Sequence, residues 1–247
     1  MMTTILPLLA ILAATPAATP SQGMKAGINQ KCLLAKSADG KDASALIALG
    51  ELAMVRDDPK TALDDFQAAG KLGADVANAP VNFTLVKGVL WIQNDECPVP
   101  VPAPSAAQLA AAELSIEAVP GPKVAYPVGA SRVVHSEGNA HPRAWIGADG
   151  KPERIAIIDV TSGPPGFEHN EGRKLGDEAG ERLFGRIQFA IAALDALRGY
   201  DFGAANAGKV WDKKIEFIPT ENFEPGAGPD TSALPTTGTT LQTIGGH

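Results

Sequence analysis

The side chains that could carry out catalysis or bind a metal are few in this chain of 247 residues. The four histidines are His135, His141, His169 and His247. None of them lies in a motif that spaces a nucleophile, a base or a set of metal ligands for hydrolysis. One short cluster, Glu168-His169 with Glu171, has metal-binding side chains, so a metal-dependent hydrolase is kept as a minor alternative. We therefore expect a protein that is not an enzyme, with no metal site and no cofactor.

The two cysteines, Cys32 and Cys97, offer a second kind of chemistry. Two cysteines this far apart, with no paired histidine, lack the ligand spacing of a zinc site. In an exported protein an even number of cysteines indicates a disulfide. We expect a Cys32–Cys97 disulfide, and two unrelated buried thiols are the alternative.

The first 23 residues, MMTTILPLLAILAATPAATPSQG, have the pattern of a secretory signal peptide. Ile5 to Ala14 is an apolar stretch too short to span a bilayer, and small residues and prolines follow it. The usual Lys or Arg before the apolar stretch is missing. We expect export to the periplasm, and a short anchor that keeps the protein at the inner membrane is the alternative.

The composition limits the class of partner. The formal net charge is -7, and Lys and Arg are scattered along the chain. Nucleic acids and anionic membrane surfaces need clustered basic residues, so we expect neither as the main partner. Hydrophobic residues make up 45% of the chain, which is enough for a packed core.

Residues 24–97 are predicted to form a small helical unit. Residues 24–36 have a modest helical pattern, and residues 43–75 hold two apolar helical stripes separated by Asp57-Asp58-Pro59. Pro59 suits the first turn of the second helix. The spacing resembles that of a single tetratricopeptide unit at these positions: Leu49-Gly50, Ala62, Phe66 and Ala69. An ordinary helical hairpin explains the spacing equally well.

The segments around this helical pair must help to bury it. A single repeat unit cannot bury its outer face alone, so residues 24–36 and 77–94 should pack on it. Residues 77–94 fit either a further helix or strands, because they contain Val, Phe, Thr and Ile. Residues 98–122 are expected to be a proline-rich linker with a short helix at 106–117, since proline stands at every second position of 98–104. Residues 224–247 are rich in Gly, Pro and Thr, and we expect a disordered tail.

Residues 123–223 are predicted to form a separate β-β-α-β domain. Residues 137–159 show the period-two pattern of two strands, with Asp149-Gly150 as a hairpin turn between them. Residues 186–197 have a helical apolar face that ends before Gly199. Residues 213–219 alternate again, with Ile215 and Phe217 facing one way. The predicted fold class is α+β, with a small antiparallel sheet.

Several short motifs in this domain occur in the order found in one known family. Tyr126-Pro127 with Ala130 is similar to a Tyr-Pro-x-x-Ala motif, and Glu137-Gly138 to the Glu-Gly that opens a first strand. Leu197-Arg198 with Tyr200 and Phe202 is similar to a Leu-Arg-x-Trp-x-Phe segment after a helix. About 100 residues therefore resemble the TonB C-terminal domain, found in energy transducers of transport across the outer membrane.

This resemblance implies a binding site rather than an active site. In the family, the last strand pairs with an extended segment of an outer-membrane transporter, a mode called strand addition. The residues that correspond to such a site here are Tyr126, Pro127, Lys213, Lys214, Ile215, Glu216, Phe217 and Ile218. Tyr126 and Pro127 could equally serve only to anchor the chain to the core. Edge strands of this kind could also pair in a homodimer.

Three features depart from the family pattern. Pro142 stands inside the first strand, where it fits only an edge or a bulge. Residues 163–185 form a long connection before the helix. The long N-terminal membrane helix that energy-transducing members use is missing, so we expect binding rather than transmission of force. The alternative function is an envelope scaffold that uses the helical unit, with Trp145 either exposed at an interface or packed under residues 163–185.

Overall fold

The computed structural model describes residues 24–111, 116, 119–127, 130, 136–163 and 178–219. The expected signal peptide, the expected tail and three of the four histidines, His135, His169 and His247, lie outside these residues. The Glu168-His169-x-Glu171 cluster lies outside them as well. None of the helices in the described part of the chain is both long and apolar enough to cross a bilayer.

Several helices of the described residues begin next to a residue whose side chain caps the first turn. They are α1 (Gln30–Ser37), α2 (Ala43–Val55), α3 (Pro59–Lys71), α4 (Ala106–Ala111) and α6 (Glu178–Arg198). Asp42 accepts a hydrogen bond from the Ala45 N–H, and Asp58 accepts one from the Thr61 N–H. These carboxylates satisfy backbone donors that a helix leaves free in its first turn. Pro59 occupies the first turn of α3, as its position in the sequence predicts.

The strands of the described residues form one mixed sheet in the order β1-β3-β2-β5-β4-β6, and β7 also pairs with β4. They are β1 (Lys25–Gly27), β2 (Phe83–Val86), β3 (Val89–Ile92), β4 (Gly138–Ile146), β5 (Pro152–Ser162), β6 (Val210–Asp212) and β7 (Ile215–Phe217). The α+β class is confirmed. The small antiparallel sheet is wrong, because the sheet has seven strands and β1 runs parallel to β3.

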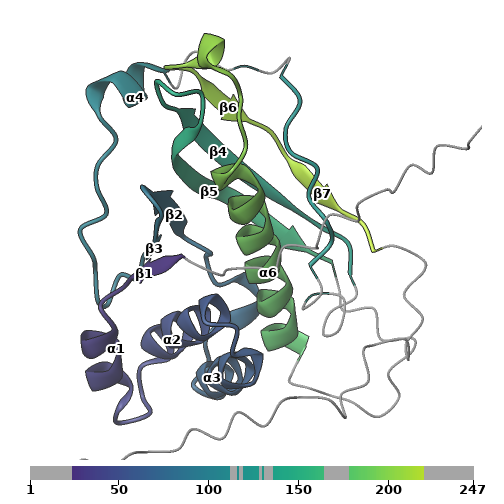
Figure 1. Cartoon of the computed structure of the whole chain (residues 1–247). Helices are drawn as coiled ribbons and strands as arrows, with labels where there is room; N and C mark the ends of the chain where they lie inside the picture. Colours follow the sequence, from purple (N-terminus) through teal and green to yellow (C-terminus); the bar gives the residue numbers. More distant parts are fainter. Residues whose placement is uncertain are drawn as a thin grey trace, which may run out of the picture.

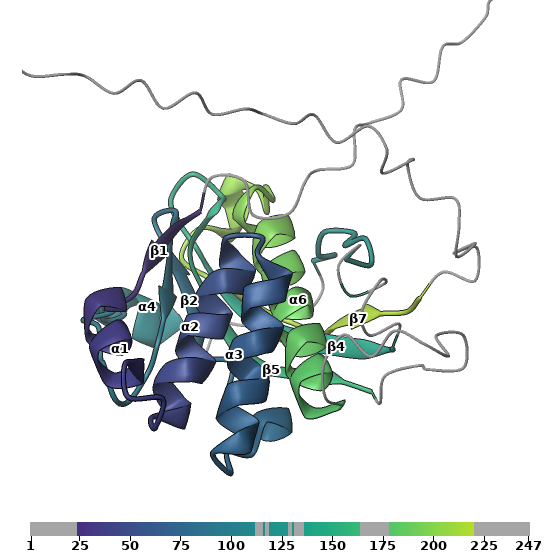
Figure 2. The same cartoon turned by 90° about the horizontal axis from the view of Figure 1, so that it is seen from below.

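This sheet joins the two regions that the sequence separates at the proline-rich linker. The strand β2 comes from the N-terminal region and pairs antiparallel with β5 of the C-terminal region. Side chains from α2, α3, α6 and the central strands also belong to one hydrophobic core. Figures 1 and 2 show α2, α3 and α6 on one face of the sheet, with α6 lying across β4 and β5.

The helical pair α2–α3 forms as predicted, and a glycine lets the two helices approach closely. A Cβ atom on Gly50 would lie 2.4 Å from the ring of Phe66, which is fully buried. Residues 24–36 differ from the helical pattern that was expected for them, because they contain the strand β1 and most of the helix α1. Residues 77–94, which fitted helix or strands, form the β2–β3 hairpin with Lys87 and Gly88 at positive φ in its turn.

The C-terminal region has the predicted two strands, helix and final strand, and a further strand that was not predicted, β6 (Val210–Asp212), precedes the last one. Asp149-Gly150 lies in the turn between β4 and β5, where Gly150 has a φ of 79°. The helix α6 begins at Glu178, eight residues before the predicted start, so residues 178–185 are helical and not part of a connection. The Leu183 and Phe184 side chains in this first part are buried, which explains why the helix extends there.

The short helix α4 and the linker cover part of the other face of the sheet. Trp145 on β4 is 8% exposed and donates a hydrogen bond from Nε1 to the Gln108 carbonyl at 2.9 Å. Arg154 on β5 lies over the Trp145 ring and donates to the Pro102 carbonyl. An exposed Trp145 is therefore wrong, and the described residues that cover it lie in 102–111. Most of the connection expected over Trp145, residues 164–177, lies outside the described residues.

Candidate partner-binding edge

The strands β6 and β7 behave as one interrupted strand along the outer edge of β4. The β4–β6 pairs run from Trp145↔Val210 to Arg143↔Asp212, and the β4–β7 pairs continue the same register from Ala140↔Ile215 to Gly138↔Phe217. Only Lys213 and Lys214 separate the two strands. Figure 1 shows β6 and β7 following one another along this border of the sheet. We call residues 212–218 the β6–β7 edge.

The interruption follows from Pro142. In the shared register Pro142 lies opposite Lys213, and proline has no N–H to donate to that residue. On its other side, the register of β4 with β5 shifts between His141 and Pro142. The expectation that Pro142 needs an edge or a bulge is confirmed as a bulge, since β4 has neighbours on both sides.

Alternate backbone groups of the β6–β7 edge point away from β4. The Val210 carbonyl of β6 accepts a hydrogen bond from the Ile116 N–H, so it faces away from β4. Backbone groups alternate along an extended strand, so the continuous register turns the N–H and C=O of Lys214 and Glu216 the same way. Within the described residues, no hydrogen bond satisfies these groups of Lys214 and Glu216. The edge therefore offers donors and acceptors to another extended segment.

The side chains on the α6 side of β7 form a stack of aromatic rings. Phe217 stacks on Phe189 of α6 with ring centroids 4.6 Å apart, and Tyr126 meets Phe189 edge-on at 5.6 Å. Ile215 is half-buried on the same side, so the predicted alternation of Ile215 and Phe217 is confirmed. A Cβ atom on Gly138 would lie 2.2 Å from the Phe189 ring, so the glycine provides the space for this stack.

Tyr126 and Pro127 are tied to the core, and Tyr126 meets Phe189, the ring on which Phe217 of β7 stacks. The Tyr126 hydroxyl donates a hydrogen bond to the Ser136 carbonyl at 2.7 Å, two residues before β4 begins. Burial raises the pKa of Tyr126 to about 12, which keeps the hydroxyl protonated as a donor. Pro127 is buried. Both residues fit the expected anchoring of the chain, and Tyr126 is linked to the edge through the Phe189 ring.

The remaining predicted site residues divide between the two faces. Lys213 is half-buried and donates from Nζ to the Val119 carbonyl at 3.3 Å, beside Trp211. Lys214 and Glu216 are exposed, and Ile218 is 62% exposed. A segment added to the edge would thus meet the half-buried Ile215 on the α6 side and the opposite charges of Lys214 and Glu216 on the other side. Charged side chains at an open edge also limit unspecific pairing.

A charged cluster on the outer face holds β6 to β4, and the sequence analysis missed it. His141 and Arg143 are two residues apart on β4, and both contact the Asp212 carboxylate of β6. The Arg143 Nε donates to Asp212 Oδ2 at 2.6 Å. His141 lies on the strand face opposite Ala140 and Pro142, and that pattern alone predicts a solvated side chain, whereas the structure places it against Asp212. Its partner is 71 residues away in the sequence, and only the β4–β6 pairing brings the two together.

A buried acid in the helical layer was also missed. Glu51 on α2 is 3% exposed, and its Oε1 has no hydrogen-bond partner among the described atoms. Burial raises the Glu51 pKa to about 8, although the positive charge of Arg186 on α6 acts in the opposite direction. Arg186 itself donates to three carbonyls, those of Val160, Ala77 and Ala79.

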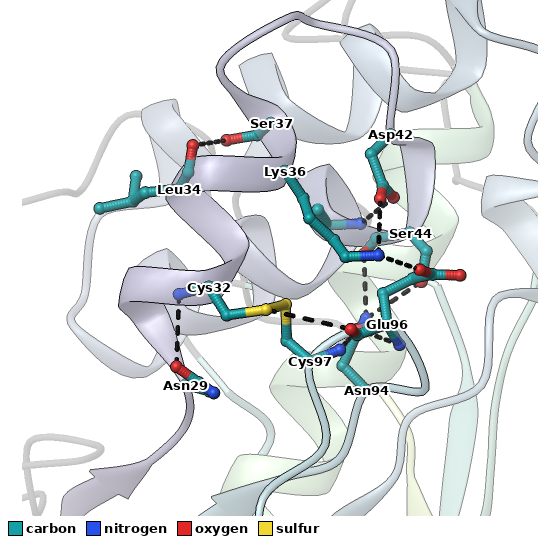
Figure 3. The surroundings of a disulfide bond; sticks show 11 residues. Asn29, Cys32, Leu34, Lys36, Ser37, Asp42, Ser44, Asn94, Glu96 and Cys97 are labelled. Carbon is teal, nitrogen blue, oxygen red and sulfur yellow. Dashed lines mark hydrogen bonds and ion pairs between the residues drawn. A yellow bond between two sulfur atoms is a disulfide. The ribbon is translucent and has the colours of Figure 1, made fainter.

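The predicted disulfide is present and lies at the opposite border of the sheet from β7. Cys32 and Cys97 are bonded with their Cα atoms 5.8 Å apart, across 65 residues of chain. Figure 3 shows the bond between α1 and the segment that follows β3, beside Lys36, Asn94 and Glu96. Among the described residues no group of three His, Cys, Asp or Glu is arranged to hold a metal ion.

Comparisons with known proteins found no match for this chain. No protein-family model matches the sequence, and no curated protein or solved structure matches it either.

Proposed function

We propose that this protein is a non-catalytic binding protein of the periplasm, similar to the TonB C-terminal domain. It binds an extended segment of an outer-membrane transporter by strand addition along the β6–β7 edge. The observation that carries the proposal is that the backbone of Lys214 and Glu216, on an edge strand of the sheet, has no hydrogen-bond partner among the described residues. Such groups give affinity to an added strand, and the side chains around them give selectivity.

The surroundings of the edge support this function. Phe217 of β7 stacks on Phe189 of α6, both of them fully buried, and the half-buried Tyr126 meets Phe189 edge-on. Since Phe217 is fixed on this stack, the edge keeps its extended shape before a partner arrives. Binding therefore needs little ordering of the receiving strand, which favours affinity.

The Cys32–Cys97 disulfide supports the expected location. Disulfides form and persist in oxidising compartments such as the bacterial periplasm. The resemblance of residues 123–223 to the TonB domain links the same compartment to transport across the outer membrane.

A backbone substitution tests the proposal without removing the aromatic stack. Glu216→Pro deletes an N–H that points away from β4, whereas Ile215 and Phe217 carry the groups that pair with β4. The full chain, with either Glu216→Pro or Glu216→Ala, is used to capture transporters from a detergent-solubilised outer-membrane fraction. We expect capture by the wild type and by Glu216→Ala, and a loss of at least tenfold with Glu216→Pro.

Two results would contradict the proposal. Capture that is equal for Glu216→Pro and Glu216→Ala would show that the edge backbone is not used. Failure of the wild-type chain to retain any outer-membrane transporter would remove the proposed partner class. Circular dichroism and urea unfolding of both variants establish that they are folded.

A further inference from the structure

The sheet has a second edge at β3, and a short segment of the chain covers it. β1 contributes three residues, Lys25 to Gly27, which pair in parallel with Val89 to Trp91. Lys25 and Ala26 are exposed, so β1 buries little surface of its own. β3 by contrast carries Leu90 and Ile92, which are buried in the main core. Removing β1 would therefore uncover the backbone of an apolar strand.

The space beside β3 that β1 fills can accept only certain strands. Gly27 lies opposite Trp91, and a Cβ atom at Gly27 would lie 2.6 Å from the Trp91 ring. A strand that replaces β1 must run parallel to β3 and have glycine at this position. A second copy of the chain supplies such a strand in its own β1.

Few contacts hold residues 24–37 in place. Leu33 is the buried side chain of α1, and it packs in a small cluster with Ala45, Ala48 and Cys97, apart from the main core. Met24 and Ile28 are only partly buried. The ion pair between Lys36 and Glu96 is formed by side chains that are 39% and 44% exposed, and exposed pairs contribute little. The Cys32–Cys97 bond (Figure 3) is the covalent restraint on this segment, which is also held by the β1–β3 pairing and by a hydrogen bond from Arg56 to Gln30.

We infer that the Cys32–Cys97 disulfide controls access to β3 as a second pairing edge, and that β1 of a second copy occupies this edge once the bond is opened. A dithiol reductant can open it, because Cys32 is the more exposed of the two cysteines and Cys97 is 1% exposed. A thiolate of the reductant attacks the Cys32 sulfur, and Cys97 leaves as a thiolate and takes up a proton. The second thiol of the reductant then displaces Cys32, so both cysteines are reduced and the reductant becomes a disulfide.

The connection after α1 allows this exchange. Residues 38–42 join α1 to α2 through a turn, with Gly40 at a φ of 61°, and these residues are mostly exposed. When this connection extends, residues 24–37 of one copy reach β3 of another. A small disulfide oxidant then reacts with Cys32 of one copy to form a mixed disulfide, and Cys97 of the other copy displaces the oxidant's thiol, so the oxidant is reduced to two thiols and the two copies are joined by a Cys32–Cys97 bond. Such a link is the pattern of a domain-exchanged dimer.

The test combines two single-cysteine chains. Cys97→Ser keeps Cys32 on the segment that moves, and Cys32→Ser keeps Cys97 beside β3. We mix the two reduced full-length chains, carrying different tags, and oxidise them gently. We expect a heterodimer on non-reducing gels, with the Cys32–Cys97 link identified by mass spectrometry. Adding Gly27→Val to the Cys97→Ser chain should lower the yield of this link at least tenfold, because the valine meets Trp91.

Random oxidation is the outcome that would overturn the inference. It would give Cys32–Cys32 and Cys97–Cys97 links as readily as the mixed link, and Gly27→Val would change nothing. Hydrogen exchange on the wild-type chain provides a second test that needs no variant. Mild reduction of a protein solution too dilute for exchange between copies should lower amide protection at least tenfold at residues 25–27 and at the β3 amides that face β1, while the β3 amides that face β2 and the amides of β5 stay protected. Equal loss over the whole chain, or no loss, would contradict the proposed role of the disulfide.

Discussion

Ionisation of Glu51 should make this protein less stable as the pH rises from about 5 to 8. In the folded protein the Glu51 pKa is raised to about 8 by burial, whereas its ordinary value is 4.5. Between these two values the unfolded chain has lost the Glu51 proton and the folded protein still holds it. The unfolded state thus binds fewer protons, so the free energy of unfolding falls as the pH rises. The contribution is fully present below pH 4.5 and is lost by about pH 8.

The size of the effect follows from the same pKa. One pH unit within this window corresponds to about 1.4 kcal/mol for a single proton. The interval from 4.5 to about 8 therefore gives a loss on the order of 5 kcal/mol. Asp65 adds a smaller loss of the same sign, because burial and the nearby Asp64 and Asp58 raise its pKa to about 6. A variant that changes Glu51 alone separates the two contributions.

Glu51→Gln has no charge to lose, so its unfolding free energy should fall much less over this range. The assay is urea unfolding of the oxidised protein at pH 4.5, 6, 7.5 and 9, followed by tryptophan fluorescence. At pH 9 the variant should be more stable than the wild type by several kcal/mol, and near pH 4.5 the two should be similar. The control is Glu178→Gln, since the Glu178 side chain is 63% exposed. Parallel pH profiles for the wild type and Glu51→Gln would refute the reasoning.

Three further variants test the disulfide, the packing around Phe189 and the interruption at Pro142. Replacing both cysteines by serine should lower the unfolding free energy by about 4 kcal/mol in the chain-entropy model, measured by urea unfolding; an unchanged midpoint would contradict this. Gly138→Ala should destabilise by about 1–3 kcal/mol, because its Cβ meets the Phe189 ring and the Thr161 carbonyl. Calorimetry against Gly199→Ala tests it, since Gly199 lies at an uncrowded site without a positive φ. Pro142→Val restores an N–H opposite Lys213, so amide exchange in the β6–β7 edge should slow; faster exchange would show that Pro142 does not cause the interruption.

The elements with one buried face were predictable from the sequence. Ile215 and Phe217 alternate with exposed residues, and that alternation predicted a strand with one face on the core. The start of α6 was missed, because Gly180 and Gly185 interrupt the helical pattern before residue 186. Burial of Leu183 and Phe184 outweighs the low helix propensity of these glycines.

The features that depend on distant pairing could not be predicted in the same way. Lys25 to Gly27 has no strand pattern, and it is a strand because β3 lies beside it. The pairing of β2 with β5 joins segments about 70 residues apart, and no local pattern encodes it. For the candidate site, the sequence located the edge strand and Tyr126, while the contact of His141 and Arg143 with Asp212 required the β4–β6 pairing.

The most direct test of strand addition is site-specific crosslinking in the intact cell envelope. A photoreactive amino acid replaces Glu216 on the β6–β7 edge or, as a control, the exposed Leu34 on α1. We predict a crosslink from position 216 to an extended segment of an outer-membrane transporter, lost when Lys214→Pro removes an N–H of the same edge. Equal crosslinking from both positions, or a crosslink from position 216 that Lys214→Pro leaves unchanged, would contradict strand addition at this edge.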